Sequence, residues 1–296
     1  MKRNSTKKNI MLIVVLLLMM LSNIVSLTFA IDNEVSSRGL LEQNTSTFDY
    51  CNDVVYIRSF NEEYTNNGII YTFEIPISDE SPELSVFSAN ESGMRNSNAI
   101  FRLEIYGSGG KVIGQAWRIG SIGTHNLKLT LKSGNTASSC NTEVSNTTTT
   151  NMPYWPIVIQ TKSEAVTQTK FYSVTLSGTI DGQSYVFEGD GVIFNKNGSI
   201  YPNLKDKWGN VHMTMPSSAL WTPVSNPLPA LTTSERNAYI SWYEATYNKG
   251  KALNWTNVQI HHIKPRQYGG THIYSNLMPL DTSTHTTVNT WWQNYQ

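Results

Sequence analysis

Short apolar runs separated by turn residues fill the chain between residues 54 and 194, and they lack helical periodicity. The runs are rich in β-branched and aromatic residues, and several alternate apolar with polar side chains; they cover residues 54–57, 69–75, 99–106 and 172–176. Turn signals stand between them at residues 66–68, 107–110 and 181–182. Many short strands joined by tight turns are typical of an antiparallel β-sandwich. The sequence therefore predicts an all-β, sandwich-like domain over residues 50–194, with the polar tract 142–151 as an exposed loop.

The two cysteines of the chain, Cys51 and Cys140, both lie in this front region. In an exported protein two cysteines most often pair, and a bond closing so long a loop stabilises the fold by about 3–5 kcal/mol. We therefore expect a Cys51–Cys140 disulfide. The alternative is two separate thiols, one of them buried.

Charge is distributed unevenly along the 296 residues, although the formal net charge is zero. Residues 31–194 carry 10 Lys and Arg against 18 Asp and Glu, whereas residues 195–296 carry 8 against 4. Five of the six His and six of the eight Trp also lie in residues 195–296. A length near 300 residues suits two domains, and a basic back region suits a polyanionic partner.

The N-terminus has the order of a secretory signal peptide. Four basic residues precede an apolar run over residues 10–21, and the stretch ends in a small-x-small pattern at residues 28–30. This order predicts cleavage near Ala30 and an exported, soluble protein, because no later segment is long and apolar enough to span a bilayer. A retained membrane anchor is the alternative, since apolar character continues weakly to Phe29.

Two further segments lack strand or helix patterns. Residues 31–49 are polar and predict a flexible arm, and the proline-rich residues 195–231 predict irregular connecting structure. A Thr-x-x-Glu capping box at Thr232–Glu235 then predicts a helix that ends near Tyr247. We place a small α+β domain over residues 232–296.

Histidine and asparagine residues gather in this last region at regular positions. His261 and His262 end a predicted strand over residues 258–262, so their rings point to opposite faces. We expect a turn at Gly269–Gly270, a second strand over residues 272–274 and a helix capped by Asp281. His285 and Asn289 lie one turn apart on that helix and can share one metal ion. A hairpin packed on the helix would add His261, leaving the open coordination position that a catalytic metal needs.

The whole pattern, His-His-Ile-x-Pro, Gly-Gly, Ser-Asn-Leu-x-Pro-Leu and His-x-x-x-Asn, resembles the HNH endonucleases, which are also called ββα-metal or His-Me finger nucleases. Secreted and colicin-type bacterial nuclease toxins belong to this group. The resemblance covers roughly residues 232–292 and does not reach the front domain. It implies a ββα-metal finger and hydrolysis of phosphodiester bonds.

Site roles follow from the resemblance residue by residue. It implies that His262 is the general base and that Asn276 holds the loop and orients this base. It implies that His261, His285 and Asn289 bind the metal. Lys264 and Arg266 flank the site and are expected to grip phosphates, although both residues also fit ordinary solvated charges. We expect His272 to be a bystander and Trp291–Trp292 to be core rather than a base-stacking surface.

The implied cofactor is one divalent metal ion. Magnesium is expected, but three neutral ligands also tolerate manganese, zinc or nickel. Many members of the family have Asp where His261 stands, which leaves the metal's identity open.

The implied partner is nucleic acid, with double-stranded DNA favoured by the resemblance and bound through its backbone phosphates. If the protein is a toxin, an immunity or inhibitor protein is a second partner. No Gly-x-Ser-x-Gly, Walker or dinucleotide motif points to another chemistry. The alternative is a secreted binding or adhesion module that carries an inactive HNH-like finger.

Overall fold

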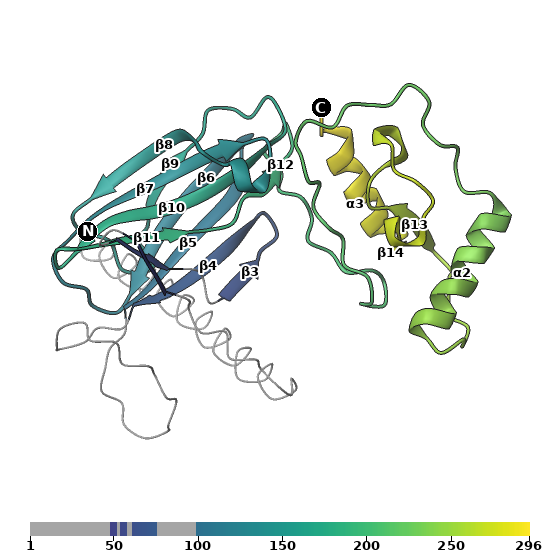
Figure 1. The fold of residues 1–296 in the computed structure, drawn as a ribbon, viewed down its shortest axis with the longest axis horizontal. Coiled ribbons are helices and arrows are strands. Elements are labelled where there is room, and N and C mark those ends of the chain that lie inside the picture. Colours follow the sequence, from purple (N-terminus) through teal and green to yellow (C-terminus); the bar gives the residue numbers. More distant parts are fainter. Residues whose placement is uncertain (1–47, 52–53, 58–60, 76–98) are drawn as a thin grey trace, which may run out of the picture. The chain divides into compact units, whose positions relative to one another are not determined.

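The computed structural model describes residues 48–51, 54–57, 61–75 and 99–296 (Figure 1). The predicted signal peptide and nearly all of the predicted arm lie outside these residues. Three β-sheets, two α-helices and three single-turn 3₁₀-helices make up the regular structure of the described part, which is mostly β-sheet. All described residues belong to one compact unit, Ser46–Gln296.

Two large sheets account for the front region. The first has the order β1 (Phe48–Cys51), β2 (Val54–Ile57), β11 (Gln183–Glu188), β10 (Lys170–Ile180), β7 (His125–Gly134) and β8 (Thr142–Thr149), with β12 (Val192–Phe194) also paired to β10. The second has the order β3 (Asn61–Tyr64), β4 (Gly68–Ile75), β5 (Ala99–Ser108), β6 (Lys111–Ile119) and β9 (Ile159–Lys162). Every pair is antiparallel except β2 with β11. The four predicted strands are therefore present.

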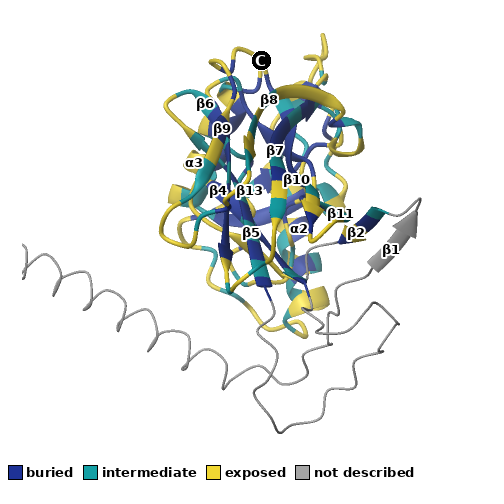
Figure 2. Ribbon diagram, turned by 90° about the vertical axis from the view of Figure 1, so that its left-hand side faces the viewer, coloured by how far each residue is buried: buried dark blue, intermediate teal, exposed yellow. Residues whose placement is uncertain are grey.

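The two sheets share one apolar core, as the alternation along their strands requires. Positions alternate between buried and partly exposed along β5, so one face of this strand points inward. Phe101 stacks on Phe187 of the other sheet with ring centroids 5.1 Å apart, and Phe73 meets the same ring edge-on at 5.5 Å. Buried positions gather along the strands of both sheets (Figure 2).

The predicted loop over residues 142–151 is wrong, because most of it forms β8 at the edge of the first sheet. Its backbone pairs with β7, while most of its side chains face solvent. Threonine favours strands, and an edge strand buries little of its surface. The polar composition of residues 142–151 therefore reflects exposure to solvent, and it does not indicate that a strand is absent.

The predicted disulfide is not formed in this structure. Cys140 carries a free, buried thiol whose Sγ lies 3.6 Å from the carbonyl oxygen of Thr136. Burial raises the pKa of this thiol to about 11, which keeps it protonated. The side chain of Cys51 lies outside the described residues.

Residues 195–231 contain no helix or strand, as predicted. The buried carboxylate of Asp206 organises part of this segment by accepting the backbone N–H groups of Trp208, Asn210 and Val211. It also accepts the hydroxyl of Tyr243 at 2.6 Å, which ties the segment to the first helix.

The C-terminal region consists of α2 (Thr233–Tyr247), β13 (Val258–His262), β14 (Leu277–Asp281) and α3 (Thr282–Gln293). The capping box starts α2 as predicted: the Glu235 backbone N–H donates to Thr232 Oγ1 at 3.2 Å, and the Thr232 N–H donates to the Glu235 carboxylate at 2.7 Å. Strands β13 and β14 form an antiparallel two-stranded sheet.

The second strand of this hairpin begins at Leu277 and not at the predicted residues 272–274. Leu277, Met278 and Leu280 are buried on it, so burial of this apolar run decides the register. Asp281 stands at the N-cap of α3 as predicted, but its side chain makes no capping bond. It pairs instead with Lys207 Nζ at 2.6 Å.

The end of α3 packs against the front sheets. Trp291 and Trp292 are buried in one cluster with Phe171 and Ile193, which confirms their core role. Trp291 Nε1 donates to the Ser199 carbonyl at 2.8 Å. These contacts fix α3, and with it His285, relative to the sandwich.

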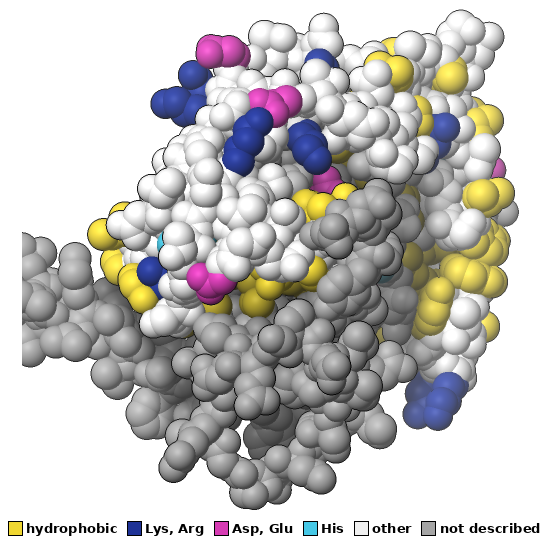
Figure 3. All heavy atoms as spheres, turned by 60° about the vertical axis from the view of Figure 1, so that its left-hand side comes forward, with side chains coloured by type: hydrophobic (Ala, Val, Ile, Leu, Met, Phe, Trp, Pro, Cys, Tyr) yellow, Lys and Arg dark blue, Asp and Glu magenta, His cyan; other side chains and the backbone are white. Residues whose placement is uncertain are grey.

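Several large hydrophobic side chains reach the surface, and Figure 3 shows such side chains exposed in several places on one face. Tyr154, Trp155 and Ile157 form one loop in which half or more of each residue is exposed. Trp117 packs against Trp155, and the Arg118 guanidinium lies 3.6 Å from the Tyr154 ring centre. This loop is therefore held firmly while it presents its apolar surface to solvent. Within the described residues, no helix has the length and apolar character needed to cross a membrane.

Candidate active site

A cleft of about 830 Å³ lies between β13 with the loop that follows it, α3, α2 and the segment 227–231. Five of the seven residues predicted to bind metal or substrate or to act in catalysis line it: His261, His262, Arg266, His285 and Asn289. The other two, Lys264 and Asn276, do not line it. The predicted core residue Trp292 lines the cleft as well. The hairpin and the last helix thus bring distant parts of the motif to one place.

The adjacent histidines of β13 face different neighbours, as strand alternation predicts. The His261 ring lies 5.2 Å from the His285 ring, centre to centre, at an interplanar angle of 80°. The His262 ring instead lies 5.2 Å from the ring of His272.

His261 is the most buried of these rings, with 4% of its surface exposed. Burial, helped by the neighbouring His285 and His262, lowers its pKa to about 3. The ring is therefore neutral near pH 7, which is the form that binds metals. Its Nε2 atom is buried without a hydrogen-bond partner, which in a folded protein costs about 1–3 kcal/mol. Such an atom is available to a ligand.

His285 and Asn289 lie one helical turn apart on α3 and touch each other. The Asn289 amide nitrogen is 3.2 Å from His285 Nδ1, so the two side chains lie side by side on one face of the helix. Burial lowers the pKa of His285 below its usual value. This ring is therefore also neutral at neutral pH.

The spacing of His261 and His285 fits one shared metal ion. A metal-bound imidazole has its ring centre about 3 Å from the ion, so two rings on one ion have centres about 5 Å apart. The observed separation is 5.2 Å. In the described part of the chain, no group of three or more His, Cys, Asp or Glu could hold an ion. An ion here would thus take its remaining ligands from Asn289, water or substrate.

Asn276 fastens the loop between the two strands. Its Oδ1 accepts the Lys264 backbone N–H at 2.8 Å, and its Nδ2 donates to the carbonyl oxygens of Lys264 and Thr271 at 3.2 and 2.8 Å. The adjacent Ile263 N–H donates to the Asn276 carbonyl at 2.9 Å. Asn276 thus holds the segment that directly follows His262, while a catalytic role stays a prediction.

The Gly-Gly turn is required by two different constraints. Gly269 has a φ of 83°, which lies in the left-handed region. A Cβ at Gly270 would lie 1.7 Å from the Lys264 carbonyl oxygen, so only glycine fits there. Both glycines let the loop close tightly beside His262.

The two side chains predicted to bind phosphate, Lys264 and Arg266, have different surroundings in the structure. Arg266 lines the cleft, and its guanidinium donates to the Leu228 carbonyl at 2.6 Å. Lys264 Nζ instead lies 4.6 Å from the Trp221 ring centre. Packing on an aromatic face explains why Lys264 is absent from the cleft wall.

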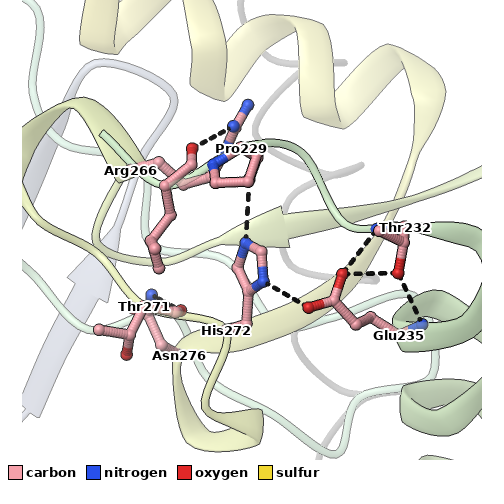
Figure 4. Close-up of polar contacts among 8 residues, drawn as sticks. Pro229, Thr232, Glu235, Arg266, Thr271, His272 and Asn276 are labelled. Atoms are coloured by element: carbon pink, nitrogen blue, oxygen red, sulfur yellow. Dashed lines mark hydrogen bonds and ion pairs between the residues drawn. The ribbon is translucent and has the colours of Figure 1, made fainter. Parts of the chain in front are cut away.

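Two features of the site were missed by the sequence reasoning. Arg236 of α2 lines the cleft and donates to the Val258 carbonyl at 3.1 Å, yet no motif marks it. His272, expected to be a bystander, lies against His262. It also contacts Glu235 (Figure 4). Only its position between Gly270 and Asn276 on the hairpin loop hinted at this proximity.

Comparison of the chain with protein-family models, curated proteins and solved structures finds no match.

Proposed function

We propose that the protein is a secreted, metal-dependent endonuclease of the HNH type that hydrolyses phosphodiester bonds in nucleic acid, with DNA favoured. One observation carries the proposal: His261, His262 and His285 line a single cleft together with Arg266. The order of hairpin and helix around the cleft, β13, β14 and α3, also agrees with a ββα-metal finger. The N-terminal sequence pattern supports the secreted location.

His261, His285 and Asn289 are the residues that would hold the metal. Magnesium is the expected ion, with manganese, zinc or nickel as alternatives. When bound, the ion supplies Lewis-acid stabilisation of negative charge on the phosphate and on the leaving oxygen.

His262 is the residue that accepts the proton of the attacking water. Burial, reinforced by the nearby His272 and Arg266, lowers its pKa to about 4, so the ring is neutral near pH 7. An anionic phosphate in the cleft would stabilise the protonated ring and raise its basicity when substrate is present.

Arg266 and Arg236 bind phosphates of the substrate backbone. Each guanidinium is held by one backbone carbonyl and keeps other N–H groups for a ligand. Contacts to phosphates position the substrate without reading its sequence. We therefore expect weakly sequence-specific, salt-sensitive binding.

The test is incubation of supercoiled plasmid with the mature protein in a series of divalent metals, with and without EDTA. We expect nicking that requires a metal and that EDTA abolishes. Absence of cleavage with every metal, on both DNA and RNA, would contradict the proposal.

A binding module is the second candidate function, and the exposed loop at residues 154–157 favours it. Rigid, solvent-exposed apolar and aromatic side chains are typical of binding surfaces. If the finger is inactive, no metal will support cleavage, and replacing Trp155 and Ile157 by Ala will abolish binding to a glycan or cell surface.

A further inference from the structure

His272 has a hydrogen-bond acceptor at each of its ring nitrogens (Figure 4). Nδ1 lies 3.3 Å from Glu235 Oε1, and Nε2 lies 3.1 Å from the carbonyl oxygen of Pro229. A carbonyl oxygen and a carboxylate can only accept. Both contacts can be hydrogen bonds at the same time only if both ring nitrogens carry a proton, which is the imidazolium form of the ring.

The two carboxylate oxygens of Glu235 contact different residues. Oε2 accepts the backbone N–H and the hydroxyl of Thr232, each at 2.7 Å, and so completes the capping box of α2. Oε1 faces His272. The Thr232 contacts, followed by His272, lower the pKa of Glu235 to about 2, so it is ionised over the physiological range.

The other partner of His272 belongs to a short segment beside the cleft. We call residues 227–231 the strap, because Pro227, Ala230 and Leu231 line the cleft. Two side chains hold its middle: Arg266 donates to the Leu228 carbonyl, and His272 contacts the next carbonyl, that of Pro229.

We propose that His272, held as an imidazolium between Glu235 and Pro229, is a positioning residue that fixes the strap as one wall of the cleft. It joins three parts of the chain: the strap, the first turn of α2 and the hairpin loop next to His262. His272 does not line the cleft, so it acts through the strap and not on the substrate directly. Its effect on cleavage rests on the proposed nuclease function, whereas its charge state and its hold on the strap do not.

The first test is NMR of the mature protein with ¹⁵N-labelled histidine and ¹³C-labelled alanine methyl groups at neutral pH. His272, assigned by comparison with His272→Gln, is expected to show two protonated ring nitrogens. The Ala230 methyl reports on the strap. A single protonated nitrogen in the unmodified protein would overturn the proposal.

Glu235→Gln and Thr232→Ala form a matched pair of variants. Glutamine keeps the capping-box hydrogen bonds but removes the charge that faces His272, whereas Thr232→Ala weakens the cap and leaves the ion pair. We expect Glu235→Gln to convert His272 to a singly protonated ring and to shift or broaden the Ala230 signal. Thr232→Ala should change neither. Equal effects of the two variants would show that only helix stability is involved, which overturns the proposal.

The last test measures the KM and kcat of nucleic-acid cleavage by the same variants. For Glu235→Gln and His272→Gln we expect a KM raised by about threefold to tenfold, with kcat changed little, because a charge-assisted contact that shapes the cleft is lost. Thr232→Ala should keep the original KM. An unchanged KM in Glu235→Gln would refute the effect on substrate. If the unmodified protein does not cleave at all, the nuclease proposal fails, and the NMR result still decides the role of His272.

Discussion

Histidine is used differently in the two regions of the molecule. Both ring nitrogens of His125, the single histidine of the sandwich, contact backbone groups. Nε2 accepts the Met152 N–H at 2.7 Å, and Nδ1 lies 2.8 Å from the Gly123 carbonyl oxygen. In the C-terminal region, the Nε2 atoms of His261 and His262 are buried with no partner. A satisfied histidine stabilises a loop, whereas an unsatisfied one beside a cleft costs stability and is available for chemistry.

The largest expected effect is on the rate of cleavage, and it distinguishes a catalytic histidine from a structural one. His262→Ala should lower the rate of plasmid cleavage by about 10²–10⁴-fold, because the proton acceptor is removed. His125→Gln is the matched control: it should destabilise the sandwich by about 1 kcal/mol and leave the cleavage rate unchanged. Comparable losses of cleavage activity in both variants would contradict the claim that His262 is catalytic and His125 is structural.

Metal affinity should depend on the C-terminal region alone. His285→Ala should weaken binding of manganese, measured by calorimetry, by about tenfold or more, since one of two imidazole ligands is lost. His262→Ala should bind the metal nearly as well as the unmodified protein. Normal metal binding by His285→Ala would remove this residue from the ligand set.

The stability of the metal-free protein should fall at acidic pH because of the buried rings. The pKa values of His261 and His262 lie at about 3 and 4 in the folded chain, below the usual 6.5, so the unfolded chain binds more protons. The free energy of unfolding therefore falls as the pH drops below 6.5, and the loss is complete only near those lower values.

Urea unfolding in EDTA between about pH 7 and pH 5 measures this effect while carboxylates stay ionised. We expect a loss of up to about 2 kcal/mol from His261, and less from the more exposed His262. His261→Gln should flatten the pH profile. A profile equally steep in that variant would mean that the ring is not buried as described.

The smallest expected effect concerns the cations of the cleft. Arg236→Gln and Arg266→Gln should each lower the slope of log affinity against log salt for DNA by about 1. Lys264→Gln should change the slope less, because its ammonium group packs on Trp221. A larger change for Lys264 than for Arg236 would show that the substrate follows a different path.

Local signals in the sequence predicted much of this arrangement. The capping box of α2, the strand that ends in His261–His262 and the helix that carries His285 all lie where the sequence placed them. Each depends on neighbouring residues: a cap, an alternating pattern or a helical spacing. Their meeting in one cleft was predicted from the motif and is seen in the structure.

The features that sequence reasoning missed depend on contacts between distant segments. Edge strand β8 has polar side chains, and only its pairing with β7 identifies it as a strand. The start of β14 is decided by burial of Leu277 and Met278 under neighbouring elements. The places of Arg236 and His272 depend on where α2 and the strap pack, which no local pattern records.

The most direct test of the account is a crystal soaked with manganese and measured by anomalous scattering. We predict one strong peak within about 2.0–2.3 Å of ring nitrogens from both His261 and His285, with the His262 ring beside it and not bound to it. A peak elsewhere, or none between these two rings, would contradict the central claim.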